Sequence, residues 1–285
     1  MCDSEKPDAS QFAGKCLLDG RRCVVTGAGA GIGRQIAYTL AEQGARVGVL
    51  DYKEELAESA VELINGDFAD RAFSVVADVS DMDAVGDALA AAGERFGGAL
   101  DVFVNNAGIN VPCRVEDLPL DGGMDGLIRQ VMVNQVGAFC CAAHAYPLLV
   151  EGRQPVFIMI GSCASVGSEG QAAYSSTKAA LRGMLGALVK EWAGTEDRQA
   201  VRVGLVEPDY FEATPLRGGG YLEALARARR TAVENVSNAA VARQKVPLRR
   251  EGRLVEIGEK AVMMALDTYA NGAIEVLSGG KTVRP

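Results

Sequence analysis

The sequence predicts an α/β fold in which helices cover both faces of a doubly wound parallel sheet of about seven strands. Short apolar runs rich in Val and Ile alternate with longer amphipathic stretches. This pattern is typical of strands that are buried on both faces and joined by helical crossovers. No internal repeat and no linker rich in Pro, Gly or Ser divides the chain. We therefore expect one domain over residues 21–285, preceded by a flexible lead-in at residues 1–20.

Each expected strand is a short apolar run that ends at or next to Gly or a polar residue. In chain order these runs are Cys23–Thr26, Val47–Asp51, Ala72–Asp78, Val102–Asn105, Val156–Gly161, Val201–Glu207 and Ala273–Leu277. The stretches expected to form the helices between them are Ile32–Gln43, Lys53–Asn65, Met82–Phe96, Leu127–Leu149, Ala172–Trp192 and Glu256–Thr268. Gln130–Val150 is uncharged and long enough to span a membrane, but it contains Asn134 and Pro147. We therefore expect a buried helix there and no membrane span.

Residues 209–250 break the alternation of strands and helices. The segment contains Gly218, Gly219 and Gly220 in succession. It is rich in arginine, with Arg217, Arg227, Arg229, Arg230, Arg243, Arg249 and Arg250. An insertion before the last strand lies near the carboxyl ends of the strands, where sheets of this kind bind their ligands. We expect a small helical substrate lid in this segment.

Composition limits the compartment and the partners. The chain has 29 Lys and Arg against 37 Asp and Glu, for a net charge of −8, so we expect neither nucleic acid nor an anionic membrane as a partner. Its seven cysteines are an odd number, and its first ten residues lack an apolar leader. We therefore expect a reduced, cytoplasmic protein. Since Cys and His do not cluster with metal-ligand spacing, no metal is expected.

A glycine-rich segment follows the first expected strand and leads directly into a helix. Glycines permit a tight turn and allow backbone N–H groups to approach a pyrophosphate, which the helix N-terminus also attracts. The residues expected to contact a dinucleotide here are Gly27, Gly29, Ala30, Gly31, Ile32 and Gly33. Asp51, at the end of the next strand, is placed to accept hydrogen bonds from the adenosine ribose and to repel a 2′-phosphate. The alternative is a surface carboxylate in a turn. The sequence therefore favours NAD over NADP.

Two later strands also end in polar residues. Asp78 and Val79 are expected to hold the adenine ring, with Asp78 facing its amino group. The run Asn105-Asn106-Ala107-Gly108 is either an ordinary turn or a support for cofactor and sheet, and the residues alone leave both open. We retain Asn105, Ala107 and Gly108 as candidate cofactor contacts.

Three motifs together resemble the short-chain dehydrogenase/reductase family. They are Thr26-Gly27-x-x-x-Gly31-x-Gly33, Asn105-Asn106-Ala107-Gly108 and Tyr174-x-x-x-Lys178, and the resemblance extends from about Arg22 to Gly280. It implies a Rossmann-type domain, a nicotinamide cofactor and a homodimer or homotetramer. It also implies a catalytic group, which corresponds here to Asn134, Ser162, Tyr174 and Lys178.

The chemistry of this group follows from the residue types. Tyr174 and Lys178 are one helical turn apart and therefore lie on one face of a helix. The pKa of a free tyrosine is near ~10, and a neighbouring ammonium stabilises the phenolate. Tyr174 is then able to exchange a proton with an alcohol or ketone while the nicotinamide exchanges the hydride, and Tyr174 and Lys178 would also contact the cofactor. Ser162 is expected to hold the substrate oxygen. The resemblance implies that Asn134 holds a water that links Lys178 to solvent.

The sequence departs from the family after the sixth strand, where Pro208-Asp209 replaces the usual Pro-Gly beside the nicotinamide. The local turn is therefore expected to differ, although Pro208 and Phe211 remain candidate cofactor contacts. Thr214 is a candidate for a family threonine near the carboxamide, displaced by one position.

The substrate is less defined than the reaction. The arginine-rich segment and the chain ending resemble sugar-alcohol members of the family, including sorbitol-6-phosphate dehydrogenases. One or two lid arginines either bind a phosphate or carboxylate, or form a solvated face or subunit contact. We expect an oxidoreductase of a secondary alcohol or ketone, with a polyol or sugar derivative as a candidate substrate. The alternatives are a ketoacyl, steroid or diol reductase and, from another class, a non-catalytic NAD-binding regulator.

Overall fold

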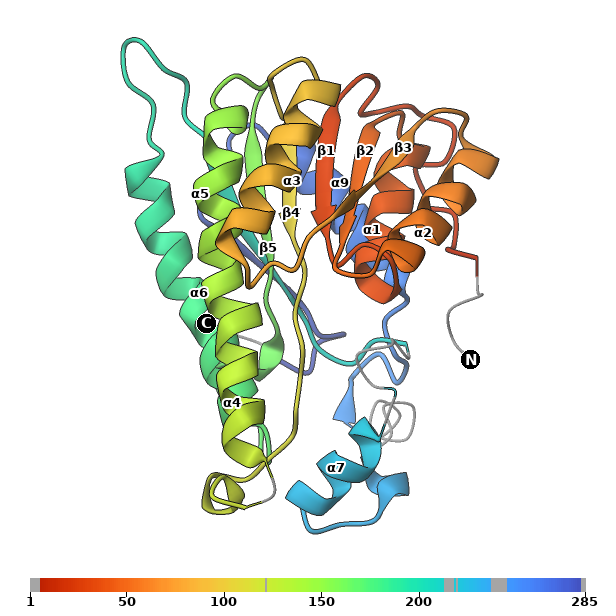
Figure 1. Cartoon of the computed structure of the whole chain (residues 1–285). Coiled ribbons are helices and arrows are strands. Elements are labelled where there is room, and N and C mark those ends of the chain that lie inside the picture. The colour runs from red at the N-terminus through yellow and green to blue at the C-terminus, as the bar shows by residue number, and fades with distance from the viewer. Residues whose placement is uncertain (1–5, 121, 213–217, 219, 237–244, 283–285) are drawn as a thin grey trace.

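The protein forms a sheet of seven parallel strands in the order β3-β2-β1-β4-β5-β6-β7 (Figure 1). The structure is a computed structural model, and it describes residues 6–120, 122–212, 218, 220–236 and 245–282. The strands are β1 (Arg22–Thr26), β2 (Arg46–Asp51), β3 (Ala72–Val76), β4 (Val102–Asn105), β5 (Val156–Ile160), β6 (Arg202–Pro208) and β7 (Ala273–Leu277). The strand order reverses between β1 and β4, which is where ligands bind in open α/β sheets.

Helices cover both faces of this sheet. On one face lie α1 (Gly31–Glu42), α2 (Glu54–Asp67) and α9 (Leu254–Leu266), and on the other α3 (Met82–Arg95), α5 (Gly137–Leu149) and α6 (Ala172–Glu191). Short 3₁₀ turns are η1 (Val115–Asp117), η3 (Cys163–Val166) and η5 (Val233–Asn235). The fold class predicted from the sequence is confirmed.

Strand β5 shows why the strands read as continuous apolar runs. Phe157 and Met159 belong to the core under α3, α5 and α6. Val156, Ile158 and Ile160 belong to the core on the opposite face. Every residue of the strand is buried because each of its two faces is covered by a helical layer.

The long helix expected at Leu127–Leu149 is observed with an interruption. Helix α4 (Gly123–Val131) continues through five residues of π-helix, η2 (Met132–Val136), into α5. A π turn holds one more residue than an α turn, so it changes which side chains face the sheet, and it is frequent at functional sites. In the part of the chain that the structure describes, no helix combines the length and apolarity needed to cross a bilayer.

The segment 209–250 is described in part and contains the expected helix. This helix, α7 (Tyr221–Ala228), lies below the sheet in Figure 1, apart from both helical layers. Its Leu225 and Ala226 form a small cluster of their own with Val236. Thr214, Arg217, Gly219 and Arg243 lie outside the described residues.

Part of the expected N-terminal lead-in lies against α1 and α9. The backbone N–H of Ser10 donates to the Glu42 carboxylate at 3.2 Å, and that of Gln11 donates to Glu259 at 2.7 Å. Both carboxylates are buried, so these donors satisfy groups that burial would otherwise penalise. The flexibility expected for 1–20 stays a prediction, and these contacts were not expected from the sequence.

Candidate active site

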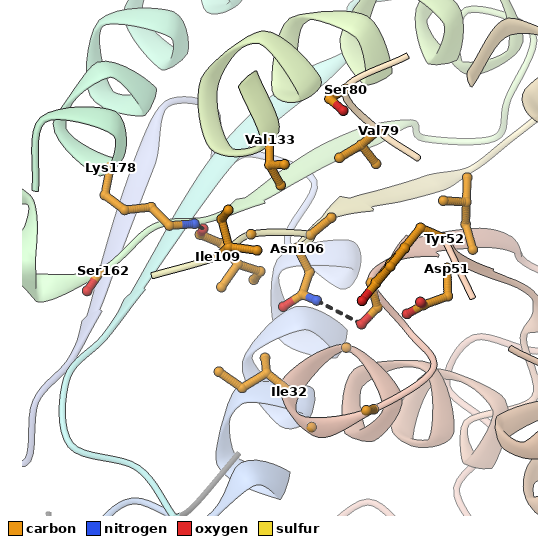
Figure 2. A pocket seen from close by; sticks show the side chains of 18 of the residues that line it. Ile32, Asp51, Tyr52, Val79, Ser80, Asn106, Ile109, Val133, Ser162 and Lys178 are labelled. Atoms are coloured by element: carbon orange, nitrogen blue, oxygen red, sulfur yellow. Dashed lines mark hydrogen bonds between the residues drawn. The ribbon is translucent and has the colours of Figure 1, made fainter. Parts of the chain in front are cut away.

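A cavity of about 530 Å³ opens at the carboxyl edge of the sheet. Figure 2 shows Ser162 and Lys178 at one end, Asp51 and Tyr52 at the other, and Asn106 between them. Its length and its position at the reversal of strand order suit an elongated ligand that reaches from β2 to α6.

Most of the residues predicted for the site line this cavity. They are Gly27, Ala30, Gly31, Ile32, Gly33, Asp51, Asp78, Val79, Ala107, Gly108, Ser162, Tyr174, Lys178, Pro208 and Phe211. Gly29, Asn105 and Asn134 do not belong to its lining. The lining also contains residues that the sequence analysis did not select, among them Tyr52, Lys53, Asn106, Arg129, Asp209 and Glu212.

The glycine-rich loop is shaped by close backbone packing. Gly27 and Gly31 have positive φ values of 60° and 54°, a region that favours glycine. A Cβ on Gly33 would clash with the Gly27 carbonyl and lie 2.6 Å from Asn106 Nδ2. Helix α1 begins at Gly31 without a side-chain cap at Ala30, so its first N–H groups have no side-chain acceptor there and line the cavity. Such an arrangement suits an anionic group.

Asp51 is buried at the end of β2, where its carboxylate organises the same loop. The N–H of Gly29 donates to Asp51 Oδ2 at 3.0 Å, and the N–H of Lys53 donates to Oδ1 at 3.2 Å. Only 5% of Asp51 is exposed, so it is not the surface carboxylate of the alternative interpretation. Gly29 lies behind the lining because its N–H points at Asp51.

Asn106 fastens β4 to the glycine-rich loop. Its side chain donates from Nδ2 to the Thr26 carbonyl at 2.9 Å. It also donates to the Gly27 carbonyl at 3.3 Å, the bond drawn in Figure 2. The backbone N–H groups of Asn106 and Ala107 both donate to Thr26 Oγ1 at 3.0 Å. Asn105 is the last residue of β4 and is buried. The run therefore supports the sheet and the glycine-rich loop, and its contact with a cofactor stays a prediction.

Asp78 and Val79 follow β3 and line the opposite end of the cavity from Ser162. The Asp78 carboxylate accepts hydrogen bonds from the Ser80 N–H at 2.9 Å and from its hydroxyl at 2.7 Å. Val133, on η2, lies across from Val79 (Figure 2). Val79 and Val133 thus form an apolar surface beside the Asp78 carboxylate.

Helix α6 carries Tyr174 and Lys178, and both side chains are buried where it borders the cavity. The Lys178 Nζ lies 5.9 Å from the centre of the Tyr174 ring and donates to the Ile160 carbonyl at 2.8 Å. Burial lowers the pKa of Lys178 to about 8, because the charged ammonium loses its hydration there. Ser162 follows β5, and its Oγ accepts from the Ala164 N–H at 3.1 Å, which leaves its hydroxyl proton free to be donated.

Asn134 lies behind Lys178 and Gly108, inside the π turn. Its Oδ1 accepts from the Ile109 N–H at 2.8 Å, and its Nδ2 donates to the Ile109 carbonyl at 2.9 Å and to Thr177 Oγ1 at 3.1 Å. A Cβ on Gly108 would lie within 3.3 Å of both Asn134 Oδ1 and Lys178 Nζ, so the two polar atoms flank the same glycine. Asn134 thus joins the segment after β4 to α6.

A buried ion pair beneath the site was not predicted. Glu207, at 0% exposure on β6, pairs with Arg182 of α6, and Ser165 Oγ donates to Glu207 Oε1 at 2.9 Å. The hydrogen bond to Glu207 raises the pKa of Arg182. An acidic residue inside an apolar run was the available signal, because a buried charge requires a partner. Ser165 is committed to this pair, whereas Ser162 faces the cavity.

Asp209 follows β6 where the family has glycine. It is not among the described residues with positive φ. Its N–H donates to the Leu277 carbonyl at 3.0 Å, and its carboxylate pairs with Lys281 at 3.0 Å. The expected difference in the turn is therefore accommodated by an ion pair to the segment after β7.

The lid arginines that the structure describes do not line the cavity. Arg229 donates to Ser168 Oγ at 3.0 Å and to the Glu169 carbonyl at 3.0 Å. Arg230 pairs with Glu116 at 3.4 Å, and Arg250 with Glu256 at 2.6 Å. These partners belong to the body of the protein, so Arg229, Arg230 and Arg250 attach the segment to the body.

Comparisons with known proteins identify the family. The sequence profile described as short chain dehydrogenase matches residues 21–220. Sorbitol-6-phosphate 2-dehydrogenase from Klebsiella pneumoniae is 30% identical, with 91% of this chain and 95% of that protein aligned. D-threitol dehydrogenase from Mycolicibacterium smegmatis is 31% identical, with 94% and 95% aligned.

A solved structure is similar over nearly the whole chain. It is 3-ketoacyl-(acyl-carrier-protein) reductase from Brucella melitensis complexed with NADH, at 26% identity and a TM-score of 0.76, with 93% of this chain and 100% of that chain covered. The profile match covers more than half of the sequence, and the resemblance read from the three motifs is confirmed. The protein belongs to the short-chain dehydrogenase/reductase family of oxidoreductases.

Proposed function

We propose that the protein is an NAD-dependent oxidoreductase that interconverts a secondary alcohol and a ketone, with Tyr174 as the general acid and base. One observation carries the proposal: Ser162, Tyr174 and Lys178 line one end of a cavity whose other end contains Asp51. A proton-transfer group and a dinucleotide cradle are thus joined in one space.

The residues present fit a dinucleotide. The glycine-rich loop leaves no room for a side chain at Gly33, and its N–H groups and the α1 N-terminus suit a pyrophosphate. Asp51 suits the ribose hydroxyls and would repel a 2′-phosphate, which supports NAD over NADP. Asp78 and Val79 suit the adenine. When bound, the nicotinamide supplies the hydride acceptor or donor.

The proton is handled by residues of this chain. In the oxidation direction Tyr174 accepts the alcohol proton, and in the reduction direction it donates that proton to the carbonyl oxygen. The Lys178 ammonium, held by the Ile160 carbonyl, stabilises the phenolate. Ser162 donates a hydrogen bond to the substrate oxygen and holds it near Tyr174. Asn134 keeps the Ile109 backbone fixed behind Lys178, where a water would connect the lysine to solvent.

For the substrate we propose a neutral polyol or related hydroxylated molecule. The two relatives act, by their names, on a phosphorylated and on an unphosphorylated sugar alcohol, so the choice rests on the site. The segment after β6 brings Asp209 and Glu212 to the lining. Asp209 is paired with Lys281, so Glu212 supplies the negative charge that would repel a phosphate. Among the described arginines only Arg129 lines the cavity, and it is the residue that an anionic substrate would use. A ketoacyl, steroid or diol substrate is the alternative.

The remaining parts of the proposal concern the whole molecule. Residues 21–285 act as one dehydrogenase domain, with 209–250 as the substrate lid. The described cysteines are all free thiols, which supports a cytoplasmic protein. Ile128 and Phe139 are 54% and 52% exposed on α4 and α5, which supports a homodimer or homotetramer that covers them.

The experiment is a panel of alcohols and ketones assayed by NADH absorbance, with neutral and phosphorylated polyols in matched pairs. Tyr174→Phe should abolish turnover while the Kd for NADH changes less than about twofold, because the lost hydroxyl serves the proton step. Tyr269→Phe is the control, since Tyr269 is 97% exposed. Retained activity in Tyr174→Phe refutes the general-base role. A higher kcat/KM for the phosphorylated partner of each pair refutes the neutral substrate, and NADH binding without any turnover favours the regulator.

A further inference from the structure

Gln171 is the residue just before α6, but its side chain makes no capping hydrogen bond to that helix. Only 6% of it is exposed. Its Nε2 donates to the Tyr221 hydroxyl at 3.1 Å, and its Oε1 accepts from Ser168 Oγ at 2.7 Å and from Arg229 Nη2 at 3.3 Å. Two of these three partners belong to α7 and its C-terminal end. A buried amide at the start of the helix that carries Tyr174 is therefore satisfied mainly from the lid segment.

Helix α7 is attached to the body at both of its ends. Tyr221, its first residue, also accepts from Asn110 Nδ2 at 3.4 Å. Arg229, directly after its last residue, donates to Ser168 and to the Glu169 carbonyl. The contact is close, because a Cβ on Gly170 would lie 2.7 Å from the Ala228 Cβ.

The attachment of α7 to the body is more polar than apolar. Of the three buried apolar side chains of α7, Leu225 and Ala226 group with Val236 and not with either core of the sheet, and only Ala228 packs against the body, at Gly170. Hydrogen bonds thus provide much of the described link between α7 and residues 168–171. Such bonds are directional and each contributes modestly, so they fix a geometry more than they add stability.

We propose that Gln171, Tyr221 and Arg229 are positioning residues that couple the docking of α7 to the placement of Tyr174. The inference rests on the proposed function of Tyr174. Residues 168–171 lead directly into the first turn of α6, where Tyr174 lies three residues after Gln171. Ser175 Oγ, adjacent to Tyr174, accepts from the Ser168 N–H at 3.1 Å. With α7 docked, both sides of this turn are held; with α7 undocked, the buried Gln171 amide loses two partners and the turn must rearrange.

The test removes the polar atoms and keeps the packing. Tyr221→Phe deletes one hydroxyl, and Arg229→Lys keeps the charge but loses the forked donors. Arg227→Gln is the matched control, because Arg227 is exposed on the same helix. We expect Tyr221→Phe and Arg229→Lys to lower kcat about tenfold, since small misplacement of a catalytic group is costly. The KM for NAD should stay unchanged, and Arg227→Gln should match the wild type.

The pH dependence separates positioning from a general loss of structure. In alcohol oxidation the phenolate of Tyr174 is the reactive form, and a Tyr174 displaced from Lys178 needs a higher pH to reach it. The kcat deficit of both variants in the oxidation direction should therefore shrink as the pH rises. A deficit that is constant with pH, or a kcat equal to that of the wild type, overturns the inference.

A second measurement requires no substrate. Amide hydrogen exchange of residues 171–175 should be faster in Tyr221→Phe and Arg229→Lys than in Arg227→Gln. Faster exchange in a protein that turns over nothing would leave the link between α7 and α6 standing and remove the proposed function. If the wild type is active and exchange is unchanged in Tyr221→Phe and Arg229→Lys, the inference is overturned and the proposed function stands.

Discussion

Replacing Lys178 with methionine should stabilise the apo protein at neutral pH while it removes the proposed catalytic ammonium. The lysine is buried at the cavity, and its described hydrogen-bond partner is a backbone carbonyl and not a carboxylate. Methionine has a similar length and carries no charge. The effect of Lys178→Met on stability and its effect on activity are therefore expected to have opposite signs.

The magnitude follows from the pKa of Lys178, which burial lowers to about 8 from the usual 10.5. At about 1.4 kcal/mol per pKa unit, the buried charge costs about 3 kcal/mol of folding free energy below pH 8. Between pH 8 and 10.5 the folded lysine loses its proton while the unfolded one keeps it, so this cost falls and then disappears. Losing the hydrogen bond to Ile160 costs about 1–2 kcal/mol at any pH. Lys178→Met should therefore raise the free energy of unfolding by about 1–2 kcal/mol at pH 7. Near pH 10 this difference should vanish or change sign.

The assay is urea unfolding of the apo protein and of Lys178→Met at pH 7, 9 and 10. Lys190→Met is the control, because Lys190 is exposed on the same helix. The informative quantity is the change in the stability difference with pH, which packing differences leave unaffected. A difference that stays constant from pH 7 to pH 10 refutes the argument that the charged form is penalised by burial.

Three further substitutions test other parts of the site. Asp51→Ala should narrow the preference for NADH over NADPH by about tenfold, and an unchanged ratio of the two Kd values would show that this carboxylate does not select the cofactor. Arg182→Met should lower the free energy of unfolding by about 3 kcal/mol, because the buried Glu207 carboxylate loses its ion pair with Arg182. Adding Glu207→Gln should recover part of this loss in urea unfolding, and no recovery would contradict the pairing. Gly33→Ala should weaken NADH binding more than about tenfold in a fluorescence titration, since the new methyl meets Asn106, and wild-type affinity would show that the loop yields.

The sheet was predictable from the sequence because each strand is buried on both faces and therefore reads as an unbroken apolar run. The glycine-rich loop and Asp51 of the proposed dinucleotide site could also be predicted, since a glycine-rich turn and a carboxylate after the next strand are local signals. Asn105 and Asn106 show where such signals end. Both are polar residues at a strand end, and only the register of β4 decides that Asn105 is buried in the sheet and Asn106 reaches the loop and the cavity.

Other features depend on contacts between residues far apart in the chain. The role of Arg229 was open between binding an anion and making a protein contact, and its partner Ser168 is 61 residues away. The π turn around Asn134 reflects a shift in backbone hydrogen bonding that side-chain periodicity does not encode. Asp209 differs from the family glycine, but its ion pair with Lys281 appears only when β7 is placed beside β6.

The hydrogen bonds of Asn106 between β4 and the glycine-rich loop have a consequence for how this protein can change over evolutionary time. Together with the N–H of Ala107, it fastens the two strands at the reversal of strand order beyond their last backbone pair, through Thr26 and Gly27. The glycine-rich end of the proposed nucleotide site is therefore held by residues of the first half of the chain. Mutations in the insertion after β6 leave these bonds in place, so substrate preference and, through α7, the placement of Tyr174 are open to divergence while the proposed nucleotide site is kept.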